Sequence, residues 1–101
     1  MTLGDFLKFE EDLIRLTRDF SKQNNYSLEI KDYPNGITDL NIGNTTNRNF
    51  VQVVYSERSF FKPGGISIKG LQNFERVKGE YISYLIDKLP GIKSSIENLN
   101  S

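Results

Sequence analysis

Apolar residues in the first 25 positions recur at the spacing of an amphipathic helix. Steps of three and four residues place them on one face, which comprises Phe6, Phe9, Leu13, Leu16 and Phe20, widened by Leu7 and Ile14. Thr2 and Asp5 fit a capping box at the start of this helix. Asn24 and Asn25 tolerate left-handed backbone, so we expect the helix to end there. Its regular spacing also fits a helix that pairs with another chain, although it is too short for a sustained coiled coil.

After this helix the period of the pattern changes to two, which is typical of β-strands. Leu28 and Ile30 alternate with polar residues, and so do Leu40 and Ile42. Between them, Pro34-Asn35-Gly36 supplies the fixed φ and the permissive glycine of a tight turn. The two segments are expected to pair as an antiparallel hairpin.

The longest β-branched and aromatic run is Phe50–Tyr55, and it is apolar on both faces, so we expect a central strand there. Ile66–Ile68 is expected to form a short fourth strand. Helical spacing then predicts a second long helix over about Leu71–Leu89, ended by Pro90. A last short helix is indicated by Ile92, Ile96 and Leu99.

These elements predict an α+β fold. We expect an N-terminal helix, a four-stranded antiparallel curved sheet, a long C-terminal helix and a short terminal helix. A chain of 101 residues has room for one hydrophobic core, so we expect a single domain, 1–101. Apolar content is only 37%, and a small core of this kind is often completed by a second copy, which favours a homodimer.

The chain contains no cysteine and no histidine. The first absence excludes disulfides and zinc–sulfur sites, and the second removes the commonest general base and metal ligand. Glu10, Glu11 and Asp12 are adjacent, so on a helix their carboxylates fan out instead of converging on a cation. We therefore assign no catalytic residue, no metal ligand and no cofactor, and do not expect an enzyme.

Charge is balanced, with 13 basic and 13 acidic residues, so no overall field attracts a nucleic acid or a membrane. No apolar run approaches the roughly 18 residues of a membrane span. The N-terminal residues lack the pattern of a signal peptide. These features predict a soluble, cytoplasmic protein without a membrane partner.

A curved sheet with exposed aromatic rings and nearby cations can bind a single nucleic-acid strand without reading its sequence. The candidate residues are Arg48, Arg58, Lys62 and Lys69 for phosphate contacts, and Tyr55, Phe60 and Phe61 for base stacking. Each stacked base would contribute roughly 1 to 3 kcal/mol. Composition alone favours the alternative, in which these residues are solubilising charges beside core aromatics.

A resemblance to a known family bears on this choice. The segment Phe61–Ile68, followed by a long helix with an early aromatic at Phe74, resembles the transcriptional coactivator family positive cofactor four. Members of that family share a Lys-Pro-Gly loop, a Gly-Ile-Ser-Leu strand and a helix. The segments Leu40–Ile42 and Phe50–Val53 are similar to the middle hairpin of the family. The resemblance covers residues 26 to about 89 and leaves 1–25 as an added helix.

The resemblance implies a Whirly-like domain that dimerises through its helices and binds single-stranded DNA with little sequence preference. Lys62 matches the loop lysine, Arg48 lies in the hairpin that carries basic groups, and Phe60 or Phe61 lies near the aromatic that ends the long strand. This chain departs from the family pattern in its middle hairpin, where Arg48 is the only basic residue between positions 43 and 49.

The expected function is therefore non-catalytic binding of single-stranded DNA or RNA by a homodimer, in transcription, replication or repair. The alternative is a small inhibitor that binds another protein, such as an immunity protein or a phage anti-defence protein. A small neutral chain with adjacent aromatics at Phe60 and Phe61 suits that role too, because exposed rings anchor protein interfaces. The pattern leaves open whether the first helix covers its own sheet or contacts a second subunit.

Overall fold

The computed structural model describes residues 3–57 and 64–96. In chain order these residues form the helix α1 (Leu3–Gln23), the strands β1 (Leu28–Asp32), β2 (Ile37–Asn44), β3 (Asn49–Ser56) and β4 (Ser67–Gly70), the 3₁₀ helix η2 (Gln72–Phe74), the helix α2 (Glu75–Lys88) and the 3₁₀ helix η3 (Pro90–Ser95). The predicted α+β fold class is confirmed.

The strands form one antiparallel sheet in the order β1-β2-β3-β4, so each strand pairs with the next one along the chain. One row across the sheet consists of Ile30, Leu40, Val53 and Ile68, which are direct register partners. The strand expected to be central, β3, lies between β2 and β4. That prediction is confirmed.

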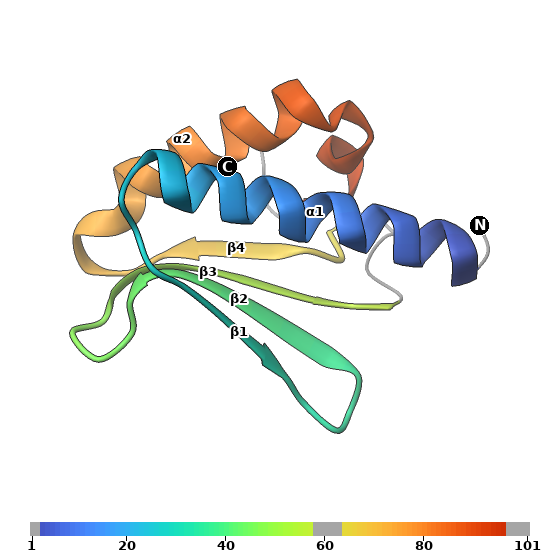
Figure 1. Ribbon diagram of the computed structural model, residues 1–101, viewed down its shortest axis with the longest axis horizontal. Coiled ribbons are helices and arrows are strands. Elements are labelled where there is room, and N and C mark those ends of the chain that lie inside the picture. The colour runs from blue at the N-terminus through green and yellow to red at the C-terminus, as the bar shows by residue number, and fades with distance from the viewer. Residues whose placement is uncertain (1–2, 58–63, 97–101) are drawn as a thin grey trace.

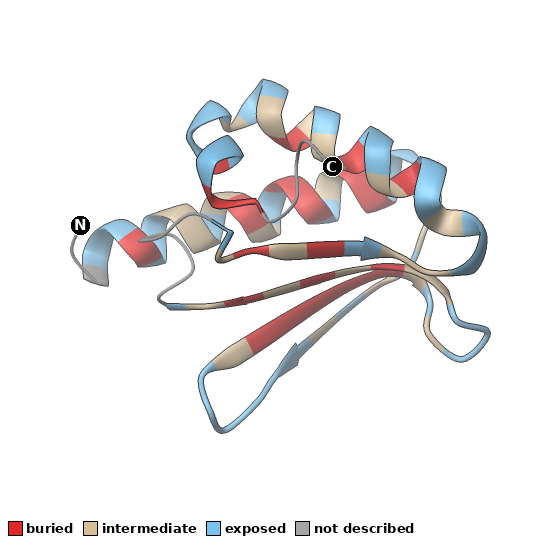
Figure 2. Cartoon of the chain, turned by 180° about the vertical axis from the view of Figure 1, so that it is seen from behind, coloured by how far each residue is buried: buried red, intermediate tan, exposed pale blue. Residues whose placement is uncertain are grey.

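Both long helices lie over the same face of the sheet (Figure 1). The hydrophobic core fills the space between the two layers, and the red segments in Figure 2 mark the elements that contribute to it. Its largest fully buried side chains are Tyr55, Tyr81, Leu13, Leu40, Ile42, Ile66, Leu85 and Ile92. The other face of the sheet has no described helix over it.

The buried face of α1 follows the predicted stripe, with Phe6, Leu13, Leu16 and Phe20 buried and Phe9 and Ile14 partly buried. Leu7 is 52% exposed, so the expectation that it widens the stripe is wrong. Asn25 has a φ of 59°, and the Asn24 side chain donates to the Phe20 carbonyl at 2.8 Å, which ends the helix as predicted. Thr2 lies outside the described residues. The first helix therefore covers its own sheet.

The second helical region differs from the prediction at its start. Instead of one helix from Leu71, the chain forms the 3₁₀ turn η2 before α2, with Gln72 at a positive φ of 57°. The buried face of α2 comprises Val77, Tyr81 and Leu85. After α2, the expected short terminal helix is the 3₁₀ helix η3, which includes Ile92 and ends before Ile96. Leu99 lies outside the described residues.

The fourth strand also lies slightly later than predicted. It runs over Ser67–Gly70, while Ile66 forms an isolated parallel bridge with Ile96. The Ile66 N–H donates to the Ser95 carbonyl at 2.9 Å. The segment after α2 therefore covers the start of the β4 edge.

Candidate binding face

Tyr55 was a candidate for base stacking, and it lies in the core. Its residue is 2% exposed, and its hydroxyl donates to Glu10 Oε2 on α1 at 2.7 Å. Burial, and then the hydrogen bond to Glu10, raise the pKa of Tyr55 far above its usual value and keep the phenol protonated. A ring held between the sheet and α1 cannot stack on a base, so the expectation of an accessible ring at Tyr55 is wrong.

Two of the candidate cations are exposed. Arg48 lies in the turn between β2 and β3, where its φ is 60°, and Lys69 is an exposed residue of β4. The remaining candidates, Arg58, Phe60, Phe61 and Lys62, lie outside the described residues. Of the residues predicted to form the site, Arg48 and Lys69 are therefore the ones that are both described and exposed.

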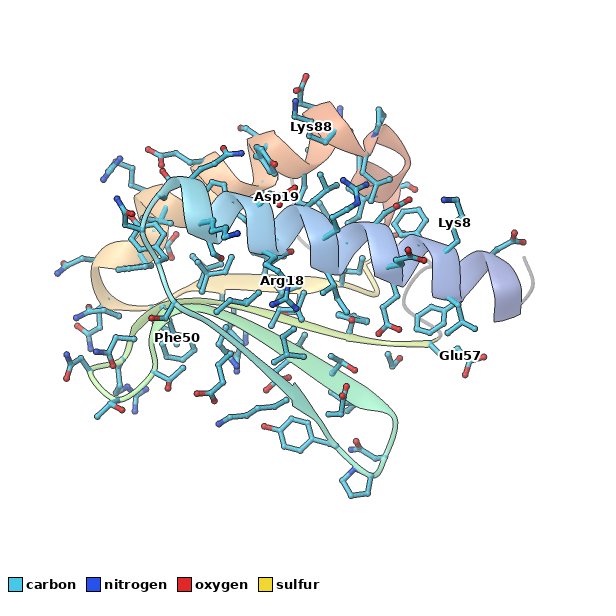
Figure 3. All side chains as sticks on the ribbon, viewed as in Figure 1. Lys8, Arg18, Asp19, Phe50, Glu57 and Lys88 are labelled. Atoms are coloured by element: carbon cyan, nitrogen blue, oxygen red, sulfur yellow. The ribbon has the colours of Figure 1, made fainter. Side chains whose placement is uncertain are left out.

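We call the side of the sheet opposite α1 and α2 the open face. Because side chains alternate along a strand, the residues between the core positions point to this side. The register aligns them in two rows, one of Glu29, Asn41, Gln52 and Lys69, and one of Lys31, Asp39, Val54 and Ser67. Figure 3 shows side chains that project from the sheet on the side away from the helices. The open face is mostly polar.

The middle of the open face is polar but buried. Asp39 is 8% exposed and Asn41 is 3% exposed, although no described helix covers them. They are adjacent same-face positions of β2, flanked by the side chains of β1 and β3. The Tyr33 hydroxyl donates to Asp39 Oδ2 at 3.2 Å and supports the carboxylate from the β1 side.

Asn41 is different, because its Oδ1 atom is buried and accepts no hydrogen bond from the described residues. A buried acceptor without a donor costs about 1–3 kcal/mol, which makes such atoms rare in folded proteins. The pattern along β2 places Asn41 on this face, since it alternates with Leu40 and Ile42. The pattern does not show that it is buried, and no other signal in the sequence singles it out.

The charges on the open face are balanced. Lys31 and Glu29 on β1 form an ion pair at 3.0 Å, and the hydrogen bond and charge of Glu29 raise the pKa of Lys31. Asp39 and Lys69 add one charge of each sign. A polyanion therefore meets as many acidic as basic groups on this part of the sheet, whereas a protein surface with both signs of charge can match it.

No group of three or more acidic side chains in residues 3–57 and 64–96 is arranged so that it could hold a metal ion. Over the same residues, no helix has the length and hydrophobicity needed to cross a lipid bilayer.

No family model matches this chain, and neither a curated protein nor a solved structure matches it. The resemblance to positive cofactor four therefore stays a prediction. The geometry of the open face is what remains to indicate a function.

Proposed function

We propose that this chain is a non-catalytic protein-binding module whose partner docks on the open face. The observation that carries the proposal is the buried Asn41 Oδ1, which accepts no hydrogen bond from the described residues. While no water reaches that acceptor, the isolated chain bears a cost of about 1–3 kcal/mol for it. A partner that supplies an N–H donor recovers this cost on binding.

The side chains beside Asn41 can move aside, so that a donor from a partner can reach its Oδ1 atom. Glu29 and Gln52 flank it in the same row, on β1 and β3. Both are long, unbranched side chains, which change rotamer at little cost when they are not fully packed. An incoming amide displaces them and reaches Asn41 Oδ1, while the displaced groups bond to the partner.

Tyr33 provides an anchor at the margin of the same surface. Its side chain is one of two large hydrophobic groups that are exposed among the described residues, with 43% of its surface accessible. Its hydroxyl donates to Asp39, which limits the positions that the ring adopts before a partner arrives. Tyrosines of this kind contribute strongly to protein interfaces because they bury a large area at a small entropic cost.

A matched pair of serine substitutions tests the proposal. Ser67→Arg places a long charged side chain on the open face, whereas Ser83→Arg places it on the exposed side of α2. We expect tagged wild-type protein and Ser83→Arg to retain the same protein partner from a lysate of the native host, in a fixed stoichiometry. Ser67→Arg should lose it. Retention by Ser67→Arg, or retention of no protein by the wild type, would contradict the proposal.

The second candidate is single-stranded nucleic-acid binding, and the exposure of Arg48 and Lys69 favours it. Fluorescence anisotropy with labelled oligothymidine separates the two. A nucleic-acid surface predicts salt-sensitive binding that the double substitution Arg48→Glu with Lys69→Glu abolishes. Ser67→Arg would strengthen such binding by adding a positive charge, which is opposite to its expected effect on a protein partner.

A further inference from the structure

The strand β1 lies at an edge of the sheet, and half of its backbone groups point away from β2. The Tyr33 N–H donates to the Ile37 carbonyl at 2.9 Å, and the Gly43 N–H donates to the Ser27 carbonyl at 2.8 Å. Bonded and non-bonded pairs alternate along an antiparallel ladder, so Glu29 and Lys31 also bond to β2.

The same alternation turns the N–H and carbonyl groups of the other β1 residues outward, namely Leu28, Ile30 and Asp32. No described residue forms a backbone bond with them on that side. At the opposite edge of the sheet, Ser95 bonds to Ile66 just before β4, so that edge is paired at its start. A row of unpaired backbone groups is a template for another strand.

The side chains of β1 are complementary to a second copy of the same strand. In an antiparallel pair with its two-fold axis at Ile30, this residue faces Ile30 of the second copy. Glu29 then faces Lys31 of the second copy, and Lys31 faces Glu29 of the second copy. Because these two pairs are non-bonded backbone pairs, their side chains approach closely.

We propose that two copies of this chain pair through β1 in this register and form one continuous eight-stranded sheet, four strands from each copy. The intrachain ion pair of Glu29 and Lys31, at 3.0 Å, becomes half of a four-charge cluster with alternating signs. Leu28 and Ile30 are only partly buried in one chain, and the second copy covers their exposed parts.

The charges also disfavour one competing alignment. A parallel pair in register places Glu29 against Glu29 and Lys31 against Lys31, which is repulsive. Directly paired residues lie on the same side of a sheet, so the antiparallel register keeps both helical layers on one side and both open faces on the other. The proposed dimer thus differs from a dimer formed through helices, which the family resemblance implies. It does not depend on the protein-binding function proposed above.

Charge reversal at β1 tests the proposal by sedimentation or light scattering over a concentration series. The wild type should reach the mass of two chains. Glu29→Lys gives only positive charges at these two positions and Lys31→Glu only negative ones, so each variant should remain at the mass of one chain. The double variant Glu29→Lys with Lys31→Glu restores opposite signs across the axis and should again form dimers.

Mixing the two single variants supplies the matched control. Every cross-strand pair is then attractive, so we expect a mixed dimer with one copy of each, which native mass spectrometry identifies. All substitutions are at exposed positions, and circular dichroism checks that the variants fold. A monomeric wild type, dimeric single variants, or single variants that fail to combine would each overturn the proposal.

Amide exchange gives a second measurement at the backbone itself. In the wild-type dimer, the amides of Leu28, Ile30 and Asp32 should be protected, and in Glu29→Lys they should exchange rapidly. The amides of Glu29 and Lys31 bond to β2 in one chain and should be protected in both. Rapid exchange at Ile30 in dimeric wild-type protein would place the interface elsewhere. Neither experiment contains a partner protein. A negative result would therefore overturn the proposed dimer without bearing on the proposal that a partner docks on the open face.

Discussion

At the scale of single residues, Thr17 and Tyr81 form a buried polar contact between α1 and α2. Thr17 Oγ1 donates to the Leu13 carbonyl at 2.7 Å, and it lies 2.7 Å from the Tyr81 hydroxyl. Threonine has one hydroxyl proton, so in this arrangement Tyr81 donates and Thr17 accepts. Both residues are fully buried. Removing the Thr17 hydroxyl therefore has a different effect from removing the Tyr81 hydroxyl.

We expect Thr17→Val to destabilise the protein more than Tyr81→Phe. The first leaves the buried Tyr81 hydroxyl without an acceptor, at a cost of about 1–3 kcal/mol. The second leaves Thr17 bonded to Leu13, so it should cost about 1 kcal/mol. Urea unfolding of both single variants and of the double variant measures this. The double variant should be more stable than the sum of the single effects, and simple additivity would contradict the contact.

For Asn41 we expect a substitution to stabilise the protein, since its buried acceptor has no donor among the described residues. Asn41→Val should stabilise the isolated chain by about 1 kcal/mol or more, because it removes that acceptor and favours a strand. Gln52→Val is the matched control, at the paired position on β3. A smaller gain there would separate the Asn41 effect from the general strand preference of valine. A loss of stability in Asn41→Val would show that Asn41 supports the fold.

At the scale of elements, two glycines near and within α2 have opposite roles. A Cβ at Gly70 would overlap the backbone oxygen of Phe74 and approach Glu75 Cα at 2.9 Å. A Cβ at Gly79, inside α2, would meet nothing within 4 Å. The first glycine lets η2 fold back against β4, while the second only weakens a helix.

Gly79→Ala should therefore raise the free energy of unfolding by about 0.5–1 kcal/mol, as expected for an exposed helix interior. Gly70→Ala should lower it by about 1–3 kcal/mol, since the backbone must move to accommodate the methyl group. Thermal unfolding of both variants checks the signs. An unchanged free energy of unfolding in Gly70→Ala would mean that the backbone at this junction shifts at little cost.

The same junction explains why the second helix was predicted too long. Periodicity places Phe74 on the helical face, but the close approach of Gly70 to Phe74 and the positive φ of Gln72 tighten the first turn into η2. Periodicity identified α1, the hairpins and the core of α2 because each repeats over several local residues. It cannot detect a contact that one turn of backbone makes with a strand.

At the scale of the whole molecule, Tyr55 and Tyr81 connect the sheet and α2 to α1, and both must be neutral in the fold. Burial, and for Tyr55 also the bond to Glu10, raise their pKa values above the usual range. Below about pH 10, tyrosine is neutral in both the folded and the unfolded chain, so this contribution to stability is fully present. Above that pH only the unfolded chain ionises, and stability falls.

We expect the free energy of unfolding to decrease by about 1.4 kcal/mol per pH unit for each of these two tyrosines as pH rises above about 10. In Tyr81→Phe, the free energy of unfolding should decrease less steeply, by about 1.4 kcal/mol per pH unit. Urea unfolding over an alkaline pH series measures it. Val77→Ala, a core substitution without an ionisable group, is the control and should lower stability at every pH without changing the slope. An unchanged slope in Tyr81→Phe would contradict the raised pKa.

The sequence by itself determined the element types, their order and the fold class, because helical and strand periods are written in local runs of residues. Alternation along β3 also puts Val51, Val53 and Tyr55 on the same side of the strand. Only the tertiary structure decided which side α1 and α2 cover. Alternation along a strand separates the faces without naming the buried one, since that depends on contacts with distant residues such as Glu10. For the same reason, only the tertiary structure showed that Tyr55 lies in the core and that the buried Asn41 lies in the middle of the open face.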